Sequence, residues 1–237
     1  FLLEHQIKMG RDRLFDVLSA NYLLVKRRKK QTITTNSYHR FKKYPNLIRN
    51  FIPTEPNQLW VSDITYWKIA TGFVYISFIT DAYSRKIVGS HVAQTMEAVE
   101  TMEALKTAIS GLRKGPDCPF QLTHHSDRGM QYCSDKYVKL LQNNNIGISM
   151  TENGDPLENA IAERVNGIIK EEYLNDYQVN NIMEARELLD LVVKLYNNER
   201  PHMSIGNLTP NQVHQNNIKT EKLWKNYYIK NPIIVNQ

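Results

Sequence analysis

The sequence predicts a mixed α/β fold, in which helices cover a sheet, preceded by a small basic all-α region. Three segments rich in β-branched and aromatic residues follow one another beyond residue 58, and helical and strand-like segments then alternate. The first 50 residues hold 12 Lys and Arg against 3 Asp and Glu, whereas the rest of the chain is slightly acidic. A chain of 237 residues with 41% hydrophobic content can bury a full core, and no apolar run is long enough for a membrane span.

The basic region, residues 1–45, is predicted to be a helix-turn-helix. Leu14, Val17 and Leu18 repeat at helical spacing, and a second apolar stretch follows a polar break. The second helix of such a motif can enter a major groove of DNA. Five consecutive basic residues come next and could neutralise phosphates: Lys26, Arg27, Arg28, Lys29 and Lys30. A solvated basic surface would explain the same charge.

The rest of the chain is expected to divide into three parts. Residues 46–57 are polar and contain two prolines, which indicates a linker. Residues 58–200 carry the α/β pattern, and residues 201–237 form a C-terminal extension. Within the α/β part, we expect strands at 60–69, 72–80, 86–93, 120–125 and 146–150, and helices at 96–112, 135–143, 156–173 and 183–196.

Three acidic residues carry the candidate chemistry. Asp63 lies within the first predicted strand, where burying a carboxylate is costly unless a cation or hydrogen bonds compensate. Asp127 follows another strand, and Glu163 lies in a helix that begins near Asp155. Carboxylates that converge can hold a pair of hard divalent cations, which drive chemistry at phosphodiesters. Asp81 is a rival acid, but its surroundings read as turn chemistry, so we expect it to be structural.

The helix with Glu163 carries a line of polar residues. At 100° per residue one narrow arc contains Asn159, Glu163, Asn166 and Lys170, with aliphatic residues on the opposite side. We interpret this arc as an exposed ridge that binds the phosphate backbone, with an ordinary solvated helix face as the alternative. Further candidates for DNA contacts are Gln131, Arg200 and His202, although His202 could equally cap a turn.

The motifs resemble those of one family in their order along the chain. They are Trp60–Tyr66, Asp81–Gly89, His125–Tyr132, Glu158–Glu163 followed by Lys170, Tyr196–His202 and Leu208–Pro210. Together they resemble the transposases of the IS-three family, which share a retroviral-integrase-like core of ribonuclease H fold. The resemblance implies a catalytic triad of Asp63, Asp127 and Glu163 that holds two Mg²⁺ or Mn²⁺ ions, with Lys170 as the trailing basic residue.

The predicted function is therefore metal-dependent cleavage of DNA ends and strand transfer. The expected substrates are double-stranded DNA, both element ends and target, bound by a dimer or larger assembly in the bacterial cytoplasm at the nucleoid. Two alternatives stay open. One is a metal-dependent nuclease of the same fold without strand transfer, and the other is a non-catalytic helix-turn-helix protein that binds DNA.

Overall fold

The computed structural model describes residues 6–24, 39–112, 122–152, 156–220 and 223. The chain divides into two compact units, Phe1–Thr32 and Ile33–Gln237. The first unit contains helix α1, Arg11–Ala20, which ends where Tyr22 takes a positive φ of 56°. Residues 21–24 form no second helix, and the predicted basic cluster, 26–30, lies outside the described residues. The helix-turn-helix therefore stays a prediction.

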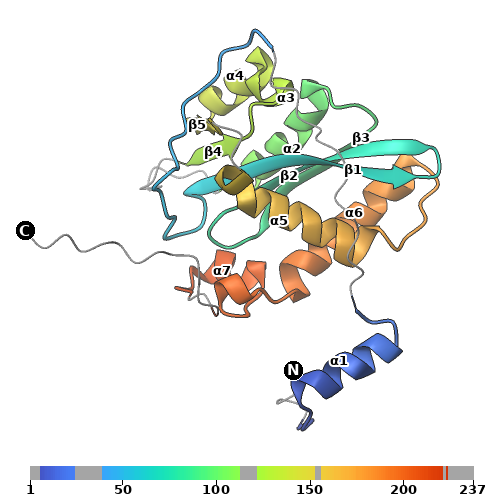
Figure 1. Ribbon diagram of the computed structural model, residues 1–237. Helices are drawn as coiled ribbons and strands as arrows, with labels where there is room; N and C mark the ends of the chain where they lie inside the picture. The colour runs from blue at the N-terminus through green and yellow to red at the C-terminus, as the bar shows by residue number, and fades with distance from the viewer. Residues whose placement is uncertain (1–5, 25–38, 113–121, 153–155, 221–222, 224–237) are drawn as a thin grey trace, which may run out of the picture. The chain divides into compact units, whose positions relative to one another are not determined.

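The second unit is built on a five-stranded mixed sheet with the order β3-β2-β1-β4-β5 (Figure 1). Its strands are β1 Leu59–Ile69, β2 Gly72–Asp81, β3 Ile87–Ala93, β4 Thr123–Ser126 and β5 Gly147–Met150. The first three strands form an antiparallel meander, whereas β4 and β5 run parallel to β1. The predicted mixed α/β sheet is confirmed.

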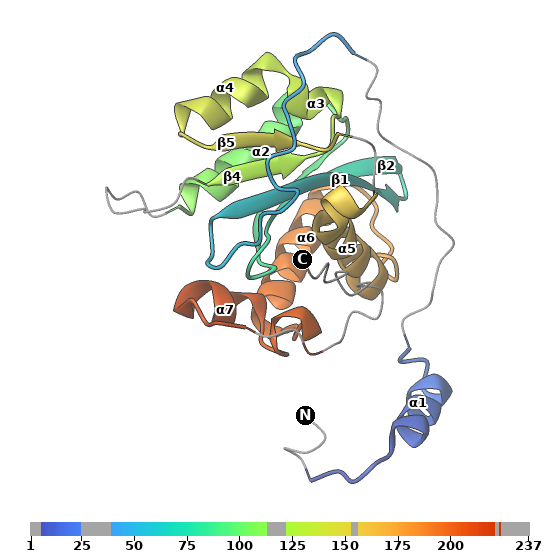
Figure 2. The same ribbon diagram turned by 60° about the vertical axis from the view of Figure 1, so that its left-hand side comes forward.

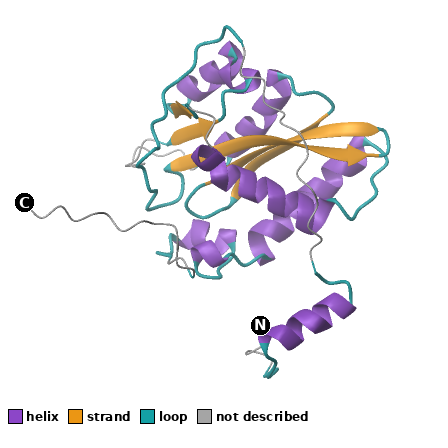
Figure 3. Cartoon of the chain, in the orientation of Figure 1, coloured by secondary structure: helices purple, strands orange, loops and turns teal. Residues whose placement is uncertain are grey.

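Helices cover both faces of this sheet, and each face has its own apolar core (Figures 2 and 3). On one face lie α2 Ala98–Ser110, α3 Met130–Cys133 and α4 Asp135–Asn143, and on the other lie α5 Ala160–Ile168 and α6 Ile182–Glu199. Successive strand residues point to opposite faces. Trp60 and Ile64 of β1 accordingly pack toward α2–α4, while Trp67 and Ile69 pack toward α5 and α6.

The predicted helix 156–173 is divided into three pieces. A 3₁₀ turn, Pro156–Asn159, leads into α5, and a π-helical stretch, Ile169–Leu174, follows it. Asp155, near which the helix was expected to begin, lies outside the described residues, and the Glu158 carboxylate accepts a hydrogen bond from the Glu152 amide at 2.7 Å. A short 3₁₀ turn, Met203–Ile205, and helix α7, Pro210–Asn216, complete the described chain.

The segment 46–57, expected to be a linker, packs against the α/β unit. The Asn46 and Leu47 amides donate to the side chains of Glu152 and Ser149, each at 2.9 Å. The Asn57 amide donates to Asp81 at 2.7 Å. The linker interpretation is therefore corrected, because the backbone donors of this segment are satisfied by the domain that it was expected only to precede. No helix among the described residues is long and apolar enough to cross a membrane.

Candidate active site

Asp63 lies on β1, and Asp127 directly follows the neighbouring parallel strand β4. The last paired residues of β1 and β4 are Val61 and His125. Asp63 lies two residues further along β1, and Asp127 lies two residues after His125, directly beyond the end of β4 at Ser126. Residues two apart on a strand point to the same face, and adjacent residues in a parallel pair share that face. The backbone amide of Ile64 donates to Asp63 Oδ1, and that of Gly129 donates to Asp127 Oδ1, both at 2.9 Å. The two carboxylates therefore lie where the β1–β4 ladder ends, close enough for the charge of Asp127 to raise the pKa of Asp63.

Helix α5 packs against β1 and brings Glu163 near Asp63 and Asp127. Asn159 donates from its side chain to the Ser62 carbonyl at 3.0 Å, and Asn166 donates to Asp63 Oδ2 at 2.8 Å. Glu163 lies one helical turn from each amide, on the same side of the helix. The predicted polar arc thus faces β1, and Glu163 is its exposed member.

The electrostatics of Asp63 indicate that the three carboxylates act on one another. Burial raises the pKa of Asp63 to about 7, and the neighbouring charges of Asp127 and Glu163 act in the same direction. The hydrogen bonds from Ile64 and Asn166 oppose this rise. A carboxylate held near two others in a partly buried site favours a cation, because a cation offsets both the desolvation and the repulsion.

The residues of this cluster fit hard divalent cations. Carboxylate oxygens are the ligands that Mg²⁺ and Mn²⁺ prefer. As placed, no three acidic, His or Cys side chains among the described residues surround a common point closely enough to hold an ion. Like charges oppose such an approach, and the exposed Glu163 side chain can rotate without displacing a packed neighbour. Asp63 and Asp127 thus form the fixed part of the cluster and Glu163 the adjustable part.

Lys170 extends the arc from the π-helical stretch toward β1. Its Nζ lies 4.3 Å from the centroid of the Tyr66 ring, within the range of a cation–π interaction. Burial lowers the pKa of Lys170, while the negative charges of Glu171 and Asp63 favour its protonated form. Sequence reasoning did not single out Tyr66, because a residue three places after Asp63 on a strand is expected on the opposite face.

Comparisons with known proteins agree with this arrangement. Two models described as "Integrase core domain" match residues 53–156 and 144–210. A 31 kDa protein of insertion element IS600 from Shigella sonnei is 36% identical, covering 88% of this chain and 76% of that protein. The transposase of insertion sequence element IS629 from the same organism is 33% identical, covering 88% and 69%.

The chain belongs to the insertion-sequence transposases with an integrase core domain. The fold agrees as well. The catalytic core domain of HTLV-2 integrase, solved in complex with magnesium, superposes with a TM-score of 0.53 at 21% identity, covering 68% of this chain and 97% of that one. The transposase core is thus a ribonuclease H-like sheet, as the resemblance in sequence implied.

Two residues of the predicted DNA-binding ridge are not exposed in this transposase. Asn159 and Asn166 retain only 6% and 5% of their surface, and both amides donate to protein groups. The expectation of an exposed ridge is wrong at these positions, because the arc faces β1 rather than solvent. Asn166 instead orients the Asp63 carboxylate.

Arg200 and His202 are also engaged within the transposase core. Arg200 makes a two-pronged ion pair with Glu172, with distances of 2.6 and 2.7 Å. His202 is buried, and its ring packs edge-on against Tyr196 at 5.1 Å between centroids. Burial lowers the pKa of His202 to about 3, so the ring is neutral. Arg200 thus joins the end of α6 to the π-helical stretch and His202 packs against α6, while the DNA contacts expected of these two residues stay a prediction.

The two remaining candidates, Asp81 and Gln131, differ in their surroundings. Asp81 is fully buried, and its oxygens accept hydrogen bonds from the amide and hydroxyl of Ser84 and from the amide of Asn57, each at 2.7 Å. The structural role expected for Asp81 is confirmed. Gln131 lies half-buried in α3, close behind Asp127, and its contact with DNA stays a prediction.

Proposed function

We propose that this transposase cleaves DNA at the ends of its insertion sequence and joins each freed 3′ end to another strand, using Asp63, Asp127 and Glu163. The observation that carries the proposal is that Asp63 and Asp127 each follow by two residues the last paired residues, Val61 and His125, of two adjacent parallel strands. The negative charge of Glu163 helps to raise the pKa of Asp63, which supports Glu163 as the third residue of the triad. In this proposal the three carboxylates, from β1, from the end of β4 and from α5, would act together on one substrate phosphate.

The three carboxylates would hold Mg²⁺ or Mn²⁺ ions, which supply Lewis-acid activation of the attacking oxygen and charge stabilisation for the leaving oxygen. In cleavage, the oxygen of water bonds to phosphorus, the bond from phosphorus to the 3′ oxygen breaks, and that oxygen takes up a proton. In joining, the freed 3′ hydroxyl replaces water, and a 3′ hydroxyl of the other strand leaves. Asn166 holds Asp63 in one orientation, and Lys170 pairs with the phosphate oxygens.

Double-stranded DNA is the proposed partner, in the form of element ends and of target. The basic first 50 residues suit the phosphate backbone, and the related proteins named above come from bacteria. Insertion requires two ends to be held together, so we propose a dimer or larger assembly on DNA, working at the bacterial nucleoid in the cytoplasm.

A cleavage and joining assay tests this function. Labelled element ends are incubated with the full chain and Mg²⁺, and we expect nicking followed by joined products from the native chain and neither from Asp127→Asn. Glu187→Gln removes an exposed acid of α6 and serves as the matched control with native activity.

A second substrate distinguishes a transposase from a nuclease of the same fold. An end that is already cleaved and carries a free 3′ hydroxyl needs no hydrolysis before joining. We expect a joined product from it. Hydrolysis of intact ends without joining of pre-cleaved ends would establish a nuclease, and full activity of Asp127→Asn would remove the catalytic assignment.

A further inference from the structure

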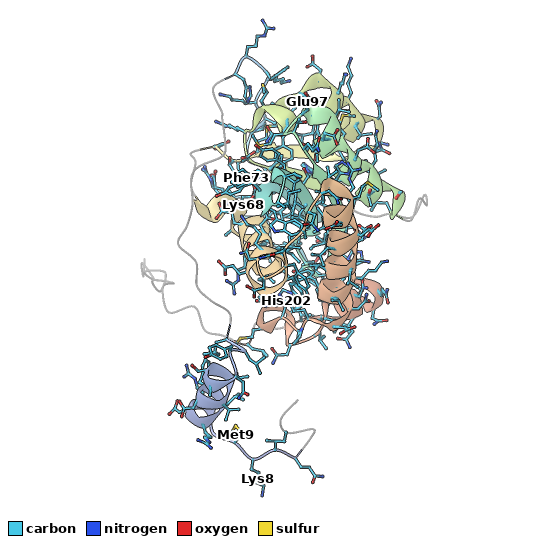
Figure 4. The ribbon with its side chains drawn as sticks, turned by 90° about the vertical axis from the view of Figure 1, so that its right-hand side faces the viewer. Lys8, Met9, Lys68, Phe73, Glu97 and His202 are labelled. Atoms are coloured by element: carbon cyan, nitrogen blue, oxygen red, sulfur yellow. The ribbon has the colours of Figure 1, made fainter. Side chains whose placement is uncertain are left out.

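An exposed aromatic surface lies on the β1–β2 hairpin. The rings of Tyr66 and Phe73 meet edge to face, with 5.7 Å between centroids and 80° between planes. Phe73 is 54% exposed, which is unusual for a phenylalanine in a strand. Lys68 pairs with Phe73 across the two strands and is also exposed, so the two side chains lie on one face, as Figure 4 shows. We call Tyr66, Lys68, Phe73 and Lys170 the hairpin platform.

The hairpin platform is continuous with the carboxylate cluster. Tyr66 follows Asp63 by three residues on β1, so its ring starts from the opposite face of the strand, roughly 10 Å further along. Lys170 links the two, because its ammonium group lies over the Tyr66 ring and is attracted by the Asp63 carboxylate. A DNA strand whose phosphate reaches Asp63 therefore has its next nucleotides within reach of the hairpin platform.

We propose that the hairpin platform binds an unpaired nucleotide of the DNA strand that enters the carboxylate cluster. The base stacks on Phe73, and the neighbouring phosphate pairs with Lys68 and Lys170. Lys170 lies over the Tyr66 ring, so the largely exposed Phe73 ring offers the open stacking surface. This inference rests on the proposed function, since it assigns a part of the DNA substrate to a surface beside the same site.

The chemistry of the hairpin platform favours nucleic acid over a second copy of this chain. Aromatic rings interleaved with cations are typical of surfaces that bind single strands, because every base has a face that can stack and every nucleotide carries a phosphate. The cores of protein–protein interfaces are instead depleted in lysine. An aromatic pair flanked by two lysines therefore matches an unpaired nucleotide.

Fluorescence of 2-aminopurine tests the stacking directly. The probe is a short oligothymidylate with one 2-aminopurine, mixed with the full chain in EDTA so that no cleavage occurs. We expect binding by the native chain to quench the probe. Phe73→Ala should abolish most of the quenching and raise the Kd by about 5-fold or more. Phe73→Leu keeps an apolar side chain without a π face and should lose the quenching as well.

Matched variants control for surface changes elsewhere. Leu191→Ala removes an exposed apolar side chain of α6, which is 53% exposed, and should leave quenching and Kd unchanged. Lys68→Ala should weaken binding and reduce the slope of log K against log salt by about 0.7, the value for one phosphate of a single strand. Lys194→Ala removes an exposed lysine of α6 and should leave that slope at its native value.

The outcomes separate this inference from the proposed function. Native quenching by folded Phe73→Ala and Phe73→Leu would overturn the inference, and a change in sedimentation of these variants with native quenching would assign the surface to contact between copies. Both results leave cleavage by the native chain and its loss in Asp127→Asn unaffected. Conversely, cleavage that survives in Asp127→Asn removes the proposed function while the quenching in EDTA still reports on the hairpin platform.

Discussion

Asp63 and Asp81 lie on adjacent strands of one sheet, and the contrast between them shows what separates a structural acid from a candidate ligand. Asp81 is buried among donors, with two amides and a hydroxyl at 2.7 Å. Asp63 receives two hydrogen bonds but also faces two other carboxylates, and its pKa is raised to about 7. Burial among donors stabilises the fold, whereas burial among like charges stores a repulsion that a cation would relieve.

The sharpest test of this contrast is Asp63→Asn. We expect cleavage of element ends to fall by about 10³-fold or more, because catalytic groups that act as a unit fail together. Stability should not fall. The folded-state pKa of Asp63 lies above its unfolded value of 3.8, so its ionisation weakens the fold as pH rises from about 4 to 7. The variant removes that loss, and urea denaturation in EDTA at pH 8 should show native or higher stability.

Asp81→Ala should give the opposite pattern. The variant leaves the Ser84 and Asn57 amides without their buried acceptor, and we expect a loss of about 3 kcal/mol in the free energy of unfolding. Urea denaturation measures it, and cleavage should fall only with the folded fraction. A stable Asp81→Ala chain that cannot cleave would place Asp81 in the chemistry and contradict the contrast.

Asn166→Ala tests the positioning of Asp63 by α5. The amide donates to Asp63 Oδ2 at 2.8 Å, and groups that orient a metal ligand typically contribute 10- to 100-fold to affinity or activity. We expect cleavage to fall by about 10-fold or more, and the Mg²⁺ concentration for half-maximal rate to rise. Asn198→Ala removes an exposed amide of α6 and should change neither quantity. A uniform loss of folded protein without the shift in Mg²⁺ dependence would assign Asn166 to stability alone.

The polar arc of α5 shows how far the sequence could predict this site. Helical periodicity alone places Asn159, Glu163, Asn166 and Lys170 on one side, and in the structure the two asparagines of this set bond to β1. Periodicity cannot say what that side meets, because solvent and a strand edge both accept polar residues. The amides that seemed free for DNA therefore turn out to hold a carbonyl and a carboxylate of β1.

Outside the site, too, the sequence could not show which distant segment a residue contacts. Arg200 and its partner Glu172 are 28 residues apart, and the π-helical stretch that carries Glu172 has no pattern in the sequence that announces it. The segment 46–57 is polar in composition, yet its amides pair with side chains of β5 and of the loop after it. Contacts between distant segments decide these cases, and composition reports only local preference.

His202 offers the smallest effect and a test of its burial. Burial, and then the charges of Arg200 and Arg85, lower its pKa to about 3, below the unfolded value of 6.5. A buried neutral imidazole stabilises the fold fully above pH 6.5, and this contribution is lost as pH falls through that value, because the unfolded chain binds the proton first. We expect the native chain to lose about 1–2 kcal/mol more stability between pH 7 and pH 4.5 than His202→Asn does. Urea midpoints at the two pH values measure the difference. Equal losses in both chains would mean that His202 is accessible to solvent, which would favour the prediction that it contacts DNA.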